Sequence, residues 1–182
     1  MNFQEYSEKY FTIPINYNPI NKALEGLKYC IKHNYLIVVA GNGGSGYTGS
    51  HFVQDLTKTC NAKAKSLNDN SGLYSALSND VGHDDVFIEQ LFRINENYLF
   101  VPISFSGNSN NIIKAADYVK NIEKLPILSF TGNNGGKLKR LSSLNINIET
   151  DNIYVGEGFH SLILHYLVDE LSKTRISPWL FY

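Results

Sequence analysis

Short apolar runs rich in β-branched and aromatic residues alternate along this chain with longer segments of helical periodicity. Such alternation is typical of a parallel sheet covered by helices. Five runs have the length and composition of strands: residues 35–40, 64–67, 98–104, 125–131 and 144–148. The first, YLIVVA, is apolar throughout, as expected of a strand buried on both faces. We therefore predict an α/β fold.

The intervening segments carry the helical periodicity. Residues 20–32 place their apolar side chains along one stripe, so a helix precedes the first strand. Further helices are predicted to begin after Ser45, near Ser71, at Asp84, after Ser109, near Gly136 and near Gly156. The ends of the chain, FTIPINYNPI and ISPWLFY, are rich in proline and aromatic residues, and we expect them to dock on a neighbouring subunit.

Size, charge and cysteine content limit the function classes. A chain of 182 residues, 43% hydrophobic, suits one domain. Its formal net charge of −1, with both signs interspersed, gives no electrostatic footprint for nucleic acid. Two cysteines without CxxC spacing fit a reducing compartment, and no signal-peptide core or apolar run near the ~18 residues of a membrane span occurs. We expect a cytoplasmic protein that binds neither nucleic acid nor membranes.

Two predicted strands end in turns suited to an anion. The first runs into Gly-Asn-Gly-Gly-Ser at 41–45, and the third into SFSGNS at 104–109. Both turns fall at the carboxyl ends of strands, where α/β sheets bind ligands. Glycines, helix-start N–H groups and the hydroxyls of Ser104, Ser106 and Ser109 suit a phosphate. The alternative is that they only make tight turns and helix caps. Neither turn has the nucleotide-binding pattern GxxxxGK[ST] or GxGxxG.

Histidines and carboxylates supply the candidate chemistry. His51 and Asp55 are four residues apart and so share a helical face, while Glu157, His160 and His165 lie on or just before the last helix. A histidine with a carboxylate can move protons or bind a divalent metal. The alternatives are an ordinary surface pair and a hydrogen-bonded core histidine. For the aspartates of SNDVGHDDVF, helix capping is the leading structural interpretation.

The ordered motifs GNGGS, HFVQDL, SNDVGHDDVF, SFSGNSNNIIKA and TGNNGGKL, followed by a histidine-bearing last helix, resemble the sugar isomerase (SIS) domain family, specifically the phosphoheptose isomerases. The resemblance implies a three-layer α/β sandwich, flavodoxin-like or Rossmann-like, with a five-stranded parallel sheet and a leading N-terminal helix. It implies one SIS domain over 1–182: an N-terminal arm and helix at 1–33, an α/β core at 34–175 and a tail at 176–182. It also implies a homotetramer with active sites at subunit interfaces.

The implied reaction converts sedoheptulose 7-phosphate to D-glycero-D-manno-heptose 7-phosphate, a precursor of surface polysaccharide. By position, the implied substrate contacts are Asn42, Gly43, Gly44, Ser45, Asn79, Asp80, Ser104, Phe105, Ser106, Ser109, Asp55 and Glu157. The implied metal ligands are His51, Asp55, Glu157 and His165, suited to one zinc ion per subunit or to another divalent metal. Asp55 is the implied base that moves a proton between C1 and C2, with His165 as its partner.

Three positions depart from the family pattern. Asp55 replaces a glutamate, Glu157 replaces a glutamine, and Phe105 replaces the middle residue of Ser-Thr-Ser. A shorter base alters the reach of the catalytic group, and an added carboxylate favours dependence on a cation. Two other hypotheses therefore stay open: an isomerase of a different sugar phosphate, and a non-catalytic binding module similar to the DnaA initiator-associating protein.

Overall fold

The computed structural model describes residues 1–173 and contains one parallel sheet with strand order β2-β1-β3-β4-β5. Its strands are β1 Leu36–Gly41, β2 Ala64–Ser66, β3 Tyr98–Ile103, β4 Leu128–Gly132 and β5 Leu144–Ile148. The predicted α/β class, with its five-stranded parallel sheet, is confirmed. The predicted tail at 176–182, including the ISPWLFY segment expected to dock on a neighbour, lies outside the described residues.

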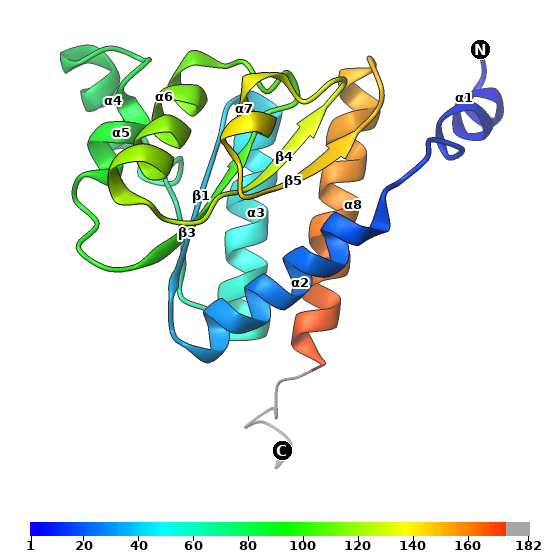
Figure 1. The fold of residues 1–182 in the computed structure, drawn as a ribbon. Helices are drawn as coiled ribbons and strands as arrows, with labels where there is room; N and C mark the ends of the chain where they lie inside the picture. Colours follow the sequence, from blue (N-terminus) through cyan, green and yellow to red (C-terminus); the bar gives the residue numbers. More distant parts are fainter. Residues whose placement is uncertain (174–182) are drawn as a thin grey trace.

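Helices cover both faces of the sheet and make three layers (Figure 1). One face carries α2 Tyr17–Lys32, α3 Gly43–Cys60 and α8 Ile153–Ser172. The other carries α4 Ser71–Asp80, α5 Val86–Leu91, α6 Asn110–Tyr118 with its π-helical extension η1 Val119–Glu123, and α7 Gly136–Leu141. The leading helix α1, Phe3–Tyr10, lies at the end of an N-terminal arm, set apart from the sheet (Figure 1).

Strand β1 shows why the layers form. All six of its residues are buried, and successive side chains point to opposite faces. Ile37 and Val39 join the core beneath α2, α3 and α8, whereas Val38 and Ala40 join the core beneath α4 to α6. Burial of each of the valine and isoleucine side chains contributes about 1.5–3 kcal/mol relative to exposure. The strand therefore contributes side chains to both cores, and its carboxyl end lies between the two layers of helices.

Several boundaries differ from the predicted ones by one to three residues, and two of these differences have a local cause. Helix α3 begins at Gly43, two residues before the predicted end of the loop, because Asn42 already has extended N-cap geometry. Strand β4 begins at Leu128 rather than at residue 125. Pro126 has no N–H to donate, although its carbonyl accepts from the N–H of Phe100 at 3.1 Å. Within residues 1–173, no helix has both the length and the apolar character required for a membrane span.

Candidate active site

The carboxyl ends of β1 and β3 lie side by side at the switch point of the sheet. In the order β2-β1-β3-β4-β5 the chain leaves β1 towards β2 and leaves β3 towards β4, in opposite directions. A crevice opens between such strands, and ligands of α/β sheets bind there. The segment 42–45 follows β1 and the serine turn 104–109 follows β3. The fold thus brings the two predicted anion-binding turns to one edge of the sheet. Residues 42–45 and 104–109 together form the serine rim.

Glycine holds the serine turn in place. Gly107 has φ +60°, and a methyl group on it would lie 2.2 Å from the carbonyl oxygen of Gly135. The Gly107 carbonyl accepts from the N–H of Leu138 at 3.0 Å, so the turn is fixed against the start of α7. Within the turn, the hydroxyls of Ser104 and Ser109 lie 3.4 Å apart. These two predicted phosphate donors therefore converge.

At this rim the N-cap residues of α3 and α6 make no cap bond with their own side chains, although the N–H of Ile112, in the first turn of α6, donates to Oδ1 of Asn111. Asn42 is the N-cap of α3 and Ser109 the N-cap of α6, and neither makes a side-chain cap hydrogen bond. The first N–H groups of a helix have no partner within the helix and carry partial positive charge. The helix-cap alternative is thus not realised at Ser109. What remains is a rim of donors suited to an anion.

Phe105 is used for packing. Its ring lies against Gly132, at the end of β4, and Gly156, in the first turn of α8. A methyl group on either glycine would come within 2.2 Å of the ring. The extra bulk at this position is therefore accommodated by two glycines. The ring links the serine turn to the helix that carries Glu157 and His165.

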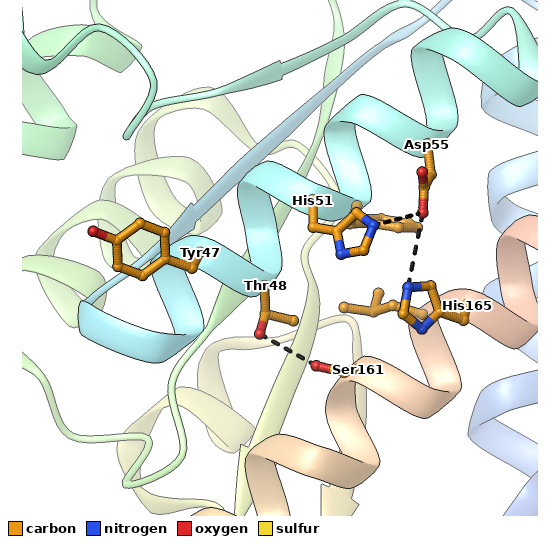
Figure 2. Close-up of a pocket in the computed structure, with 8 residues that line it drawn as sticks. Tyr47, Thr48, His51, Asp55, Ser161 and His165 are labelled. Atoms are coloured by element: carbon orange, nitrogen blue, oxygen red, sulfur yellow. Dashed lines mark hydrogen bonds and ion pairs between the residues drawn. The ribbon is translucent and has the colours of Figure 1, made fainter.

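A second cluster lies further along α3, where α3 packs beside α8 (Figure 2). His51 Nε2 is 3.4 Å and His165 Nε2 is 3.8 Å from the same oxygen, Oδ2 of Asp55. One ligand atom from each of the three residues lies within 4.8 Å of the others. Two imidazoles and a carboxylate at this spacing fit a zinc ion or another divalent metal. The cluster lines a cavity of about 210 Å³.

Glu157 lies apart from this cluster. It precedes His165 by eight residues on α8, a rise of about 12 Å. Its carboxylate instead faces Gly44, and Oε1 accepts from the Ser45 hydroxyl at 3.4 Å. Within one chain, the structure brings together three of the four predicted metal ligands. The rise of the helix is the reason that the fourth does not join them.

The serine rim and the cluster are also separated within one chain. Both α3 and α8 start at the carboxyl edge of the sheet and run away from it. His51 follows Gly43 by eight residues and Asp55 by twelve, which are rises of about 12 and 18 Å. A sugar phosphate held on the rim of the same chain therefore does not place its carbonyl carbons at Asp55 by this path alone.

The sequence did not single out two hydroxyl residues in the same helix pair. Thr48 and Ser161 face each other across α3 and α8 with their hydroxyl oxygens 3.3 Å apart (Figure 2). Thr48 precedes His51 by three residues, and Ser161 precedes His165 by four. Residues three or four apart share a helical face, so the spacing that indicated His51 and Asp55 also placed Thr48 beside His51 and Ser161 beside His165.

His160 and His165 have different environments. His160 is fully buried, and its Nε2 lies 2.9 Å from the Thr131 carbonyl oxygen. Burial lowers the pKa of His160 to about 4. The core interpretation is correct for His160. The His165 side chain is half-exposed and faces Asp55.

The remaining predicted residues lie near the end of α4 and the start of α5. Asn79 and Asp80 are exposed at the end of α4. Asp85 occupies the N-cap position of α5 without a side-chain cap bond, and its carboxylate instead accepts from Lys114 at 2.8 and 3.0 Å. The capping interpretation is therefore not realised at Asp85. The sugar-contacting roles of Asn79 and Asp80 stay predictions.

The fold and the serine rim define the class of protein. The SIS domain family model matches residues 11–132, which cover the rim and the His51–Asp55 pair. Among solved structures, a phosphoheptose isomerase from Francisella tularensis superposes with a TM-score of 0.80 at 24% identity, covering 96% of this chain and 100% of that one. This chain is thus similar in fold to that protein over nearly its whole length.

Sequence relatives narrow the class. A phosphoheptose isomerase of Helicobacter pylori is 32% identical over 171 residues, 85% of this chain and 88% of the relative. The solved phosphoheptose isomerase from Neisseria gonorrhoeae has a TM-score of 0.79 at 26% identity and covers 92% of this chain and 91% of that one. The chain belongs to the phosphoheptose isomerase family of SIS domain proteins. The resemblance drawn from the motifs is confirmed.

Proposed function

We propose that this chain converts sedoheptulose 7-phosphate to D-glycero-D-manno-heptose 7-phosphate in the cytoplasm, as an aldose–ketose isomerase serving heptose biosynthesis for surface polysaccharide. The single observation that carries the proposal is the His51–Asp55–His165 cluster, because it retains a base and two imidazoles in a member of this family. A chain released from catalysis has little chemical reason to keep them together. This weighs against the binding-module alternative.

The reaction moves a proton between C1 and C2 through an enediol. Asp55 is the proposed base, and its side chain is only 19% exposed, so it meets little competing water. His165, on the other side of Asp55 Oδ2 from His51, is the proposed partner that holds or returns a proton at the sugar oxygen. A zinc ion held by His51, Asp55 and His165 would supply positive charge to polarise the sugar oxygens.

The phosphate is proposed to bind at the other site, on the serine rim. Ser104, Ser106 and Ser109 would donate to its oxygens together with the free N–H groups at the starts of α3 and α6. Asn42 to Ser45, Asn79, Asp80 and Glu157 are the proposed contacts to the sugar. Glu157 is the residue best placed to bring a carboxylate to the first turn of α3.

Because the rim and the cluster are far apart in one chain, we propose that a homotetramer assembles each active site from two copies. The rim of one subunit would then meet the cluster of its neighbour, and Glu157 of one copy could approach the metal of another. An apolar groove of about 340 Å³ between α1 and α8 supports self-association. Its lining includes the exposed side chains Phe3, Phe11, Tyr154 and Leu162.

The test is turnover of sedoheptulose 7-phosphate by the zinc-loaded protein, followed by proton NMR of the sugar. Asp55→Asn should reduce kcat by about 10²- to 10⁴-fold, the usual contribution of a general base. No turnover by the wild-type protein would overturn the proposal. Turnover of another ketose phosphate in its place would favour the second candidate, an isomerase of a different sugar phosphate, which Phe105 and the shorter Asp55 motivate.

A further inference from the structure

A second cavity lies beside the start of α3, on the side of β2, with a volume of about 550 Å³. It is distinct from the cavity of the metal cluster, although Tyr47, which is 83% exposed, lines both. In Figure 2 the ring of Tyr47 extends away from His51 and Asp55. The residues that decide the chemistry of this second cavity are Asn42, Tyr47, Ser50, Asn68, Asp69 and Tyr74.

The lining of this cavity suits sugar hydroxyls. It offers amides, hydroxyls and two aromatic rings. Among the residues that the structure assigns to it, Asp69 has the one carboxylate and there is no cationic side chain. Ser50 donates to Asp69, which leaves the second carboxylate oxygen as an acceptor. Asn68 is held by the backbone of Gly41 through both ends of its amide. A second phosphate would find no positive partner here, whereas a polyol finds both donors and acceptors.

A series of hydrogen bonds runs from Asn42 through Asn111 and His83 to Tyr74 and joins two walls of the cavity. The donor and the acceptor of each bond can be assigned. The backbone N–H of Ile112 donates to Oδ1 of Asn111 at 2.9 Å, which identifies that atom as the oxygen of the amide. The amide nitrogen of Asn111 therefore donates at 2.9 Å to Oδ1 of Asn42 and at 3.0 Å to Nε2 of His83. Asn111 is 1% exposed, so its orientation is held by the protein.

This polarity decides the tautomer of His83. A ring nitrogen that accepts from an amide carries no proton, so the proton of the neutral imidazole lies on Nδ1. Nδ1 is 3.3 Å from the Tyr74 hydroxyl and thus donates to its oxygen. The Tyr74 hydroxyl proton then has no role towards His83 and is available to a ligand. The Tyr74 ring is held in place by an edge contact with buried Phe87 at 5.8 Å.

We propose that this cavity binds the hydroxyl-bearing part of the sugar phosphate and that His83 is a positioning residue, which holds Tyr74 as a hydrogen-bond donor to a sugar hydroxyl. The inference rests on the proposed function for the identity of the ligand, a phosphorylated ketose. It adds Tyr74, Asp69 and Ser50 to the substrate contacts and gives His83 a role in specificity. Because Asn42 belongs to both the cavity and the rim, a ligand held by its phosphate at the rim reaches this cavity directly.

The experiment compares Tyr74→Phe, His83→Leu and His83→Gln with the wild-type zinc-loaded protein. Calorimetry gives the Kd of sedoheptulose 7-phosphate and of inorganic phosphate, and steady-state kinetics give KM and kcat. Tyr74→Phe and His83→Leu should each weaken the binding of the sugar phosphate about 3- to 10-fold, as expected for one lost hydrogen bond, and leave inorganic phosphate unchanged. KM should rise more than kcat falls.

The variant His83→Gln provides the rescue. Its amide keeps an acceptor for Asn111 and a donor for Tyr74, so binding should stay within about 2-fold of wild type. The combination of Tyr74→Phe with His83→Leu should be no worse than either alone, because both remove the same donor. Tyr118→Phe, which removes a hydroxyl that donates to Glu123 away from the cavity, is the matched control.

Two outcomes overturn the inference. Either the sugar phosphate binds to Tyr74→Phe and His83→Leu as it does to wild type, or the binding of sugar phosphate and of inorganic phosphate weakens equally, which would place the effect on the phosphate rim. The proposed function fails separately, if wild-type protein binds sedoheptulose 7-phosphate without isomerising it. In that case a selective loss in Tyr74→Phe still supports the cavity as a sugar subsite.

Discussion

The carboxylate of Glu157 lies over the α-carbon of Gly44, where a methyl group would come within 2.6 Å of Oε2. A residue near the start of α8 thus places an anionic group against the first turn of α3. The positive end of a helix attracts anions with about 0.3–1 kcal/mol at exposed sites. A bound phosphate at the rim and the Glu157 carboxylate therefore compete for the same electrostatic environment.

Replacing Glu157 by glutamine should strengthen binding of inorganic phosphate to the metal-free protein by about 2- to 5-fold at low salt, and the gain should shrink as salt is added. Calorimetry at two ionic strengths measures the Kd of inorganic phosphate for wild type and for Glu157→Gln. Glu96→Gln is the control, because Glu96 pairs with Lys63 near the amino end of β3, away from the rim. Unchanged or weaker phosphate binding in Glu157→Gln would show that the carboxylate does not compete.

Mixing two inactive variants tests the shared active site. Ser106→Asp adds a negative charge to the serine turn, and His165→Ala removes a side chain of the cluster, so each protein alone should have lost turnover. Random mixed oligomers should regain activity in about a quarter of their sites, because each such site combines an intact rim with a neighbour's intact cluster. Activity is measured after the two variants are co-expressed. An inactive mixture of folded oligomers would place rim and cluster in the same subunit.

Zinc should stabilise the protein through the cluster. A ligand at 100 times its Kd adds about 2.7 kcal/mol to the native state, which corresponds to a rise in Tm of roughly 5–10 °C for a chain of this size. The rise should be lost in His165→Ala and kept in His33→Ala, whose histidine lies at the end of α2. Differential scanning calorimetry with and without zinc measures this independently of turnover. Equal rises in both variants would place the metal elsewhere.

Gly107 should be intolerant of a side chain. Alanine there would need a positive φ and would place its methyl group 2.2 Å from a backbone oxygen that cannot move freely. We expect Gly107→Ala to lower the free energy of unfolding by about 2 kcal/mol or more. Gly26→Ala is the matched control: in α2, where nothing lies within 4 Å of the added methyl group, it should raise stability by about 0.5–1 kcal/mol. Urea unfolding measures the free energy of unfolding of both variants, and a Gly107→Ala protein as stable as wild type would contradict this account.

His160 should make the metal-free protein sensitive to acid. Its Nε2–H donates to the Thr131 carbonyl, and within the described residues Nδ1 is buried without a partner, so a second proton has no acceptor. Burial lowers the pKa of His160 to about 4 from 6.5. As the pH falls, His160 therefore binds a proton in the unfolded chain before it does so in the native protein. The stability that neutral His160 contributes is present above pH 6.5 and is lost as the pH falls towards 4.

The expected loss is roughly 3 kcal/mol between pH 6.5 and 4. His160→Gln keeps a donor for Thr131 without a titrating group, so its free energy of unfolding should fall less over the same range. Urea unfolding at several pH values gives the slope of the free energy of unfolding against pH for wild type and for His160→Gln. Parallel slopes for the two proteins would mean that His160 is not the group responsible.

Much of the fold was predictable because its signals are local. The apolar run at β1, the β5 span Leu144–Ile148 and the helix before β1 follow from residue periodicity, and the parallel sheet follows from their alternation. The motifs GNGGS and SFSGNS were correctly expected at strand ends. The exact start of α3 and of β4 was not, because these boundaries depend on the Asn42 backbone and on the pairing of Phe100 with Ile127.

The sequence by itself determined the class of fold, the family, and the residue types available for phosphate and metal chemistry, since strand and helix periodicities and motif order are written in neighbouring residues. Only the tertiary structure decided which of those residues meet. It packs Phe105 against Gly132 and Gly156, separates Glu157 from His165 by two turns of one helix, and fixes the tautomer of His83 through Asn111. These relationships depend on the packing of α3, α6 and α8 around the sheet. That packing brings together residues far apart in the sequence, so no pattern of neighbouring residues predicts their contacts.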